Sequence, residues 1–353
     1  MWRLHRDAGP SGTPTPIRRL REHRLIETKG LRKSYQSRQG RQTTTVDAVR
    51  GVDLNVAEGE IFGFLGPNGA GKTTTLRMLA TLIPADAGEA RIDGVDLRAD
   101  PAAVRRRIGY VAQYGGTTEV VTAREELVMQ ARVHGFSKSE ALVRAQAAVG
   151  SFNLADYADR QCKTYSGGQR RRLDIALGVI HSPKVLVLDE PTSGLDPQSR
   201  AGMWDEVRRL RGEGMTVFIT THYLEEADAL CDRIAIIDQG EIVAEGTSEE
   251  LKRDISGDVI VIGLDRPDSG ARTEDETARR ADIAQKALAD QPYLRKLELP
   301  AEGGLRLYVD TGTTAIPQIL RALESAGVEP VLVQLQRPSL DDVFLAKTGR
   351  TLG

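Results

Sequence analysis

The chain has 353 residues, of which 40% are hydrophobic and 28% charged, so it can build a packed core and is not expected to be disordered throughout. A length of this size corresponds to two domains, or to one large domain with an appendage. The 48 basic and 50 acidic side chains give a formal net charge of -2, which argues against a nucleic-acid partner because such partners select for a strong basic excess.

Residues 1–26 are rich in arginine, glycine and proline and contain no apolar block of the kind a secretory signal needs. We expect them to form a disordered basic tail, with a membrane-touching basic arm as the alternative. No segment approaches the roughly 20 apolar residues of a membrane-spanning helix, so a partner would have to supply any spanning part. Cys162 and Cys231 lack the spacing of a zinc site and are expected to be reduced thiols.

Between residues 27 and 252, apolar runs alternate with helical patterns, which predicts an α/β domain. A helix is expected over 72–82, stopped by Pro84, and Asp196 followed by Pro197 predicts the start of another helix. The expected strands are 46–56, 61–65, 185–188, 215–220 and 233–238.

The sequence pattern differs from about residue 114 to residue 165, and this segment is expected to form a mostly helical subdomain within that domain. Two capping-box patterns mark helix starts there, at Thr122 with Glu125 and at Ser137 with Glu140. We expect two glycines, Gly135 and Gly150, to terminate these helices.

Residues 253–353 are expected to form a small α+β accessory domain with the order β-α-β-β-α-β, which is typical of a ferredoxin-like fold. In the second of its helices, Ile316, Ile319, Leu320 and Leu323 follow helical spacing. The expected elements are strand 258–264, helix 275–290, strands 294–299 and 304–309, helix 313–325, strand 328–335 and a short helix from Ser339.

A phosphate-binding loop is predicted at residues 66–73, because the segment fits the full pattern and lies between an apolar strand and a helix. Its residues are Gly66, Pro67, Asn68, Gly69, Ala70, Gly71, Lys72 and Thr73. The glycines let backbone N–H groups turn toward phosphate oxygens, and the helix start adds partial positive charge. Lys72 can neutralise the β- and γ-phosphates, Thr73 can ligate Mg²⁺, and the predicted nucleotide-binding set extends to Thr74. A glycine-rich turn with an incidental lysine is the simpler reading, and the flanking strand and helix argue against it.

Two carboxylates follow the apolar strand at 185–188, at the end of the sheet where α/β proteins hold their ligands. Asp189 can hold Mg²⁺ through water, and Glu190 can polarise an attacking water molecule. Two acids that merely cap a buried strand would be the preferred reading in isolation, but the phosphate-binding loop favours the catalytic one.

A third motif comprises Ser166, Gly167, Gly168 and Gln169 at the start of a predicted helix, where free N–H groups can bind an anion. The arginines at 170–172 follow it, and a helix-start turn with an exposed basic face is the simpler reading. Together the motifs resemble the ATP-binding cassette family, the motor subunits of ABC transporters, over about residues 27–252. The resemblance implies ATP binding and hydrolysis with Mg²⁺.

By this resemblance, Tyr35 stacks on adenine, although the polar stretch that follows it is long for the family. Gln113 links the γ-phosphate and Mg²⁺ to the helical subdomain, and His222 contacts the γ-phosphate. The catalytic set is then Glu190, His222 and Lys72, and the metal-binding set is Thr73, Gln113 and Asp189.

The resemblance also implies that two copies pair head to tail, so that ATP lies between the 66–73 loop of one copy and the N–H groups of Ser166 and Gly168 of the other. Tyr165 replaces the usual leucine before the signature, a variation seen among drug-resistance members. Asp196 matches the loop that crosses between protomers, and it can also serve simply as a helix cap. Since every motif is intact, we expect a homodimer bound to a separate ABC membrane permease, on the cytoplasmic face of the cell membrane.

The segment at 337–345, which reads RPSLDDVFL, resembles the end of daunorubicin-resistance-type ATP-binding subunits, as do YLEEAD at 223–228 and the leading Tyr165. This resemblance implies export of hydrophobic drugs or antibiotics. An exporter of polysaccharide or lipid-linked substrates remains an alternative, and so does a soluble cassette ATPase of DNA repair or translation. A nutrient importer is disfavoured, because importers with C-terminal extensions tend to end in β-rich domains.

Overall fold

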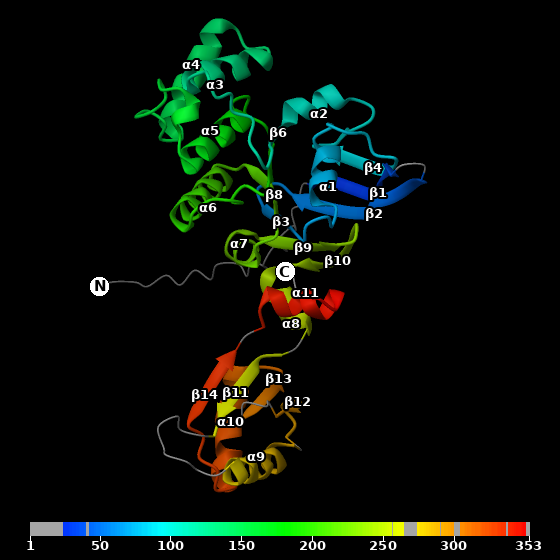
Figure 1. The fold of residues 1–353 in the computed structure, drawn as a ribbon, viewed down its shortest axis with the longest axis vertical. Coiled ribbons are helices and arrows are strands. Elements are labelled where there is room, and N and C mark those ends of the chain that lie inside the picture. The colour runs from blue at the N-terminus through cyan, green and yellow to red at the C-terminus, as the bar shows by residue number, and fades with distance from the viewer. Residues whose placement is uncertain are drawn as a thin grey trace, which may run out of the picture.

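The computed structural model describes most of the chain, and Figure 1 shows how its elements are arranged. The described residues are 24–39, 42–255, 257–264, 274–289, 291–299, 304–336 and 338–350. Residues 1–23 of the expected disordered tail lie outside the described residues. The prediction was wrong for residues 24–26, which belong to strand β1.

A six-stranded sheet forms the centre of the α/β part, with the strand order β10-β9-β3-β8-β7-β6. The strands from β9 to β6 run parallel, and β10 is antiparallel to β9. Every residue of β3, β7 and β8 is buried, as expected for a parallel sheet covered on both faces. The predicted strands at 61–65, 185–188, 215–220 and 233–238 are confirmed to within one residue at each end. Their bounds are β3 (Ile61–Leu65), β6 (Ile108–Val111), β7 (Val185–Asp189), β8 (Thr216–Thr221), β9 (Arg233–Asp238) and β10 (Glu241–Gly246).

Different layers cover the two faces of this sheet. Val187 of β7 packs in a core with helix α1 (Lys72–Leu79) and a second sheet, whereas its neighbour Leu188 packs in a core with the helical part of the chain. Helix α6 (Pro197–Gly212) and helix α7 (Leu224–Leu230) follow strands β7 and β8. Helix α1 ends three residues before the predicted end of 82, where the backbone turns through Thr81 with a φ of 57°.

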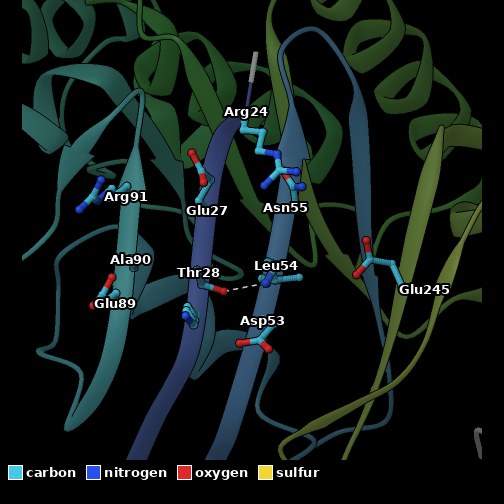
Figure 2. A pocket seen from close by; sticks show the side chains of 11 residues that line it. Arg24, Glu27, Thr28, Asp53, Leu54, Asn55, Glu89, Ala90, Arg91 and Glu245 are labelled. Atoms are coloured by element: carbon cyan, nitrogen blue, oxygen red, sulfur yellow. Dashed lines mark hydrogen bonds between the residues drawn. The ribbon is translucent and has the colours of Figure 1, made fainter. Parts of the chain in front are cut away.

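The second sheet is antiparallel, with the order β2-β1-β4-β5, and lies beside α1 in Figure 1. The predicted strand 46–56 falls inside β2, and the polar residues 36–39 and 42–44 continue the paired strands β1 and β2. A pocket of about 540 Å³ lies over this sheet. Figure 2 shows that acidic and basic side chains are mixed along it and that Thr28 accepts a hydrogen bond from the Leu54 N–H. The strands are β1 (Arg24–Gln39), β2 (Gln42–Ala57), β4 (Ala87–Ile92) and β5 (Val95–Asp96), followed by helix α2 (Pro101–Arg107).

The predicted helical subdomain contains helices α3 (Ala123–Val133) and α4 (Lys138–Ser151), and a 3-10 turn at Cys162–Thr164 leads to α5 (Gly167–Val179). Both predicted capping boxes are confirmed. Gly135, with a φ of 92°, follows the end of α3 as expected. The prediction for Gly150 was wrong, because α4 continues through it and the left-handed residue that follows the helix is Asn153.

The last part of the described chain contains the β-α-β-β-α-β unit, and its sheet has the antiparallel order β12-β13-β11-β14. Side chains from both of its helices pack in one core with this sheet, so the ferredoxin-like prediction is confirmed. Strand β14 begins at Leu332, later than the predicted residue 328. The elements are β11 (Val259–Gly263), α9 (Glu274–Leu288), β12 (Leu294–Glu298), β13 (Leu305–Val309), α10 (Gly312–Ser325) and β14 (Leu332–Gln336).

Two further helices flank this unit in sequence and pack against each other, as Figure 1 shows. Helix α8 (Ser248–Ile255) precedes the unit, and α11 (Leu340–Thr348), which begins at the predicted Ser339 cap, follows it. Val343 and Phe344 of α11 are fully buried in a core that includes Leu65, the last residue of β3. Helix α11 therefore packs on the α/β part of the molecule, where it contacts α7 and β10.

Candidate active site

The loop at residues 66–73 connects β3 to α1 in a conformation that only glycine allows at two positions. A β-carbon on Gly66 would lie 2.2 Å from the carbonyl oxygen of Ile237, and one on Gly71 would lie 2.4 Å from that of Ala48. Gly71 also has a φ of 108° and serves as the N-cap of α1 without a side-chain acceptor. The first N–H groups of the helix can therefore point at an anion.

The other members of the predicted nucleotide-binding set lie along the same loop and first helical turn. Ala70 is held from both sides, since its N–H donates to Pro67 (3.2 Å) and its carbonyl accepts from Gly240 (2.9 Å). Asn68 and Gly69 are exposed at the tip, and Thr74 is half-buried. The loop thus has a fixed base and an accessible rim.

Lys72 is buried at the centre of this site, with only 4% of its surface exposed. Its Nζ donates to the carbonyl oxygens of Gly66 (2.7 Å) and Pro67 (3.1 Å) and lies 3.2 Å from Oε1 of Glu190. Burial lowers the pKa of Lys72, and the carboxylates of Glu190 and Asp189 oppose this shift. The ammonium therefore depends on neighbouring negative charge, which a phosphate group can also provide.

Asp189 ends strand β7 and is 1% exposed. Its Oδ1 accepts from the hydroxyls of Thr73 (3.1 Å) and Thr220 (2.8 Å), and its Oδ2 lies 3.4 Å from the Tyr110 hydroxyl. Burial, followed by the charge of Asp189, raises the pKa of Tyr110, so this phenol is a neutral donor. The hydroxyl and carboxylate oxygens of Thr73 and Asp189 are the hard donors that fit Mg²⁺.

Glu190 brings together three of the predicted residues. Its carboxylate forms the ion pair with Lys72, accepts from Nε2 of Gln113 (2.9 Å) and lies 3.1 Å from Nδ1 of His222. Its backbone is in the left-handed region with a φ of 43°, and its N–H donates to the Thr220 hydroxyl (3.0 Å). A non-glycine residue in this conformation is strained, and such strain concentrates at functional sites.

The remaining predicted residues make their contacts elsewhere in the chain. Tyr35 lies on β1 opposite Val46 and is 40% exposed. Ser166 caps α5, and its N–H already donates to Oε1 of Gln169 (3.0 Å) in a reciprocal capping box, while Gly167 and Gly168 occupy the first helical turn. Asp196 caps α6, as the simpler reading expected, and hydrogen bonds from Ser199 lower its pKa.

Three residues of the site were not identified from the sequence. Tyr110 and Thr220 contact Asp189, and the guanidinium of Arg171 donates to the Asp189 carbonyl oxygen (3.2 Å). The reading of 170–172 as an exposed basic face was wrong for Arg171, which is 5% exposed. The available signal was the position of Thr220 and Asp189 at the ends of neighbouring strands, where side chains meet.

Tyr165, which stands before the signature, is also buried. Its hydroxyl donates to the Tyr157 carbonyl oxygen (2.6 Å), and its ring meets that of Tyr157 edge to face at 4.9 Å. Burial raises the pKa of Tyr165 to about 12. Tyr165 thus fits the helical part of the chain, with its hydroxyl hydrogen-bonded.

In the described part of the chain, no helix is both long and apolar enough to span a membrane.

Comparisons with known proteins agree with the motifs. Residues 49–193 match the family described as ABC transporter, and residues 246–348 match the C-terminal domain of ATP-binding proteins like DrrA1-3. The daunorubicin/doxorubicin resistance ATP-binding protein DrrA of Streptomyces peucetius is 44% identical over 336 residues, covering 92% of this chain and 93% of that protein. The Nod factor export ATP-binding protein I of Ralstonia nicotianae is 36% identical and covers 99% of both chains.

Among solved structures, a dimeric post-hydrolysis state of the ATP-binding cassette MJ0796, bound to ADP and Pi, is similar with a TM-score of 0.57. It is 27% identical in sequence and covers 63% of this chain and 98% of its own. The two family matches cover much of the α/β part, at residues 49–193, and the ferredoxin-like part, at residues 246–348. The chain therefore belongs to the ATP-binding cassette family, as an ATP-hydrolysing subunit of the DrrA type.

Proposed function

We propose that this chain powers an exporter of hydrophobic drugs or antibiotics, together with a separate membrane permease. The observation that carries the proposal is the convergence of Lys72, Asp189 and Glu190 at one end of the sheet, in a chain related over most of its length to drug-resistance ATP-binding proteins. The convergence supports ATP hydrolysis, and the relatives support the class of cargo.

In the proposed mechanism, Lys72 and the N–H groups of the 66–73 loop bind the phosphates of ATP. The Glu190 carboxylate lies 3.2 Å from Nζ of Lys72. A γ-phosphate that enters the loop would therefore compete with Glu190 for the Lys72 ammonium. Glu190 is then free to orient and polarise the attacking water. His222, whose Nδ1 lies 3.1 Å from the Glu190 carboxylate, would contact the γ-phosphate.

Mg²⁺ would be held by Thr73 and Asp189, with Gln113 approaching from the loop that leads into the helical subdomain. When bound, the ion neutralises charge on the β- and γ-phosphate oxygens. The Thr73 hydroxyl already donates to Asp189 at 3.1 Å, so both oxygen donors lie within reach of one cation. Tyr35, which is partly exposed on β1, would stack on the adenine ring.

We further propose that two copies of the chain close around two ATP molecules. Ser166, Gly167 and Asp196 are exposed and make their contacts away from Lys72 of the same chain, which supports their use by a second copy. The Ser166 N–H is engaged by Gln169, so Gly167 and Gly168 are the better candidates for backbone donors to phosphate. Purification of the complex with a second, different ATPase chain would contradict the homodimer.

The chain would lie on the cytoplasmic face of the membrane as a peripheral subunit held by the permease. We propose residues 27–252 as the nucleotide-binding domain, with its helical subdomain at about 114–165, and 253–353 as the accessory domain, with α11 returning to the nucleotide-binding domain. The net charge of -2 gives no support to a DNA-repair or translation ATPase, and no nucleic-acid partner is proposed.

A second candidate cargo is a lipid-linked saccharide, because a relative that covers 99% of this chain carries the name of a Nod factor exporter. The deciding experiment uses the chain purified with its membrane subunit in proteoliposomes. ATP-dependent uptake of fluorescent daunorubicin, abolished by Lys72→Ala, is the expected result. Uptake of a labelled lipid-linked oligosaccharide without drug uptake would favour the second cargo, and co-purification with ribosomes or DNA would remove the exporter proposal.

A further inference from the structure

Helix α5 carries a buried guanidinium behind the candidate active site. Arg171 lies in the first turns of this helix, five residues after Ser166, and is 5% exposed. Its Nε donates to the Pro191 carbonyl oxygen (2.8 Å), its Nη2 to that of Asp189 (3.2 Å) and its Nη1 to that of Ala112 (2.7 Å). One side chain of α5 thus binds two other segments of the chain, at Ala112 and at 189–191.

All three carbonyl groups belong to residues next to Glu190 or next to a partner of its carboxylate. Asp189 and Pro191 are the residues on either side of Glu190, whose own backbone is held at a φ of 43°. Ala112 directly precedes Gln113, whose Nε2 donates to Glu190 at 2.9 Å. Each hydrogen bond of Arg171 therefore fixes either the backbone of Glu190 or a partner of its carboxylate.

Burial of Arg171 carries an electrostatic cost that the site opposes. Desolvation lowers the pKa of Arg171, while the carboxylates of Asp174, Asp189 and Glu226 act in the opposite direction. A planar guanidinium with five N–H donors can bind three carbonyl groups in different directions, which a lysine ammonium on a flexible chain cannot reproduce. An apolar residue would leave these carbonyl oxygens without this donor.

The same helix also holds the loop that follows Gln113. Asp174, one turn beyond Arg171, is 6% exposed and accepts from the Gly116 N–H (3.3 Å) and the Thr117 hydroxyl (2.5 Å). A β-carbon on Gly115 would lie 2.5 Å from this carboxylate, so the loop approaches α5 closely. Helix α5 therefore contacts the chain on both sides of Gln113.

We propose that Arg171 is a positioning residue for ATP hydrolysis, which holds the Glu190 carboxylate in its catalytic orientation from the helix that begins at the signature serine. The inference rests on the proposed role of Glu190 as the residue that polarises water. Because Arg171 and the Ser166 cap belong to the same helix, Arg171 also supplies a route within one chain by which a displacement of Ser166 reaches Glu190. Among the described residues, none of the hydrogen bonds of Arg171 involves the 66–73 loop, so its effect should fall on turnover and not on ATP binding.

The test compares Arg171→Lys and Arg171→Gln with the parent in the full-length purified chain. Arg132→Gln is the matched control. Arg132 is exposed near the end of α3, and its guanidinium also donates to a backbone carbonyl oxygen, that of Phe136. We expect Arg171→Lys to lower kcat about 10- to 100-fold with a KM for ATP within about 2-fold of the parent, on the scale that misplacement of a catalytic group produces. Arg171→Gln should lower kcat further, and the control should match the parent.

A second measurement separates positioning from loss of structure. In a Glu190→Gln background, single-turnover hydrolysis of labelled ATP should change less than about 3-fold on adding Arg171→Lys, because both changes act through one group. Hydrogen exchange should rise in the 189–192 segment of Arg171→Lys, with the 66–73 loop unchanged. A full additional loss in the double variant, an unchanged kcat, or a raised KM would overturn the proposal. If the parent shows no turnover while Arg171→Lys still shows the expected rise in hydrogen exchange at 189–192, the result would instead count against the proposed ATPase role of Glu190.

Discussion

Glu190→Gln is the most direct perturbation of the candidate active site, because it removes one charge and preserves the shape of the side chain. The carboxylate lies 3.2 Å from Nζ of Lys72, 2.9 Å from Nε2 of Gln113 and 3.1 Å from Nδ1 of His222. An amide can occupy the same position, so the fold and the loop should persist. It cannot act as a base toward water, and this is the property under test.

The expected loss in turnover is about 10²- to 10⁴-fold, which is the usual contribution of a positioned acid–base group. This range corresponds to a barrier higher by about 3–5 kcal/mol. ATP affinity should stay equal or increase, because Lys72 loses its anionic partner and is then available to the γ-phosphate. Binding and turnover therefore move independently, which a general structural defect does not produce.

The assay pairs phosphate release under single-turnover conditions with equilibrium binding of a fluorescent ATP analogue in Mg²⁺. Glu213→Gln, on the exposed C-terminal end of α6, is the matched control and should leave both quantities unchanged. A Glu190→Gln rate within about 3-fold of the parent would refute the assignment. A parallel loss of ATP binding would show that Glu190 supports the loop instead of the chemistry.

Three further predictions follow from other contacts. Lys72→Ala should weaken ATP binding about 10- to 100-fold, as loss of a hydrogen bond to a charged group would, and an unchanged affinity in titrations would contradict the cradle role of the loop. Phe344→Ala should cost about 3–5 kcal/mol of local stability and expose α8 and α11 to hydrogen exchange, because Phe344 is fully buried. The neighbouring Leu345→Ala should have neither effect, because the Leu345 side chain is 45% exposed. Equal effects of the two changes would contradict the packing of α11. Burial lowers the pKa of His181 from 6.5 to about 4, so the unfolded chain binds a proton that the folded chain does not. Stability should therefore fall as the pH drops from about 6.5 to about 4, and by less in His181→Phe; the same fall in both proteins, followed by thermal denaturation, would contradict this cause.

Much of the fold follows from local signals in the sequence. The strand Ile61–Leu65 and the strand Arg233–Asp238 have the predicted bounds, because a short apolar run bounded by turn residues leaves little choice. The capping boxes at Thr122 and Ser137 were equally clear, since each satisfies its helix with two hydrogen bonds of its own. The prediction for Gly150 was wrong because a single glycine inside a helix costs only about 1 kcal/mol relative to alanine, so α4 can continue through it.

The candidate site was predictable where motif and element coincide, as at Lys72 and Asp189. Arg171 was not, because three successive arginines carry no signal of which one faces the core, and only the packing of α5 decides it. The ion pair between Lys72 and Glu190 was also unpredictable, since it depends on the distance between two strands of a folded sheet. The sequence likewise predicted a helix from Ser339 but not that it would pack against α7, α8 and β10.

The mutual packing of α8 and α11 has a mechanical consequence for the ferredoxin-like unit between them. An appendage on one linker can rotate about a single hinge, but this unit leaves and re-enters the α/β part through two helices in contact with each other. Two attachment points remove most of that rotational freedom, so a force applied to the unit is transmitted as a torque on the helix pair. Since Phe344 and Leu65 belong to one core, that torque reaches the last residue of β3, where the strand leads into the phosphate-binding loop.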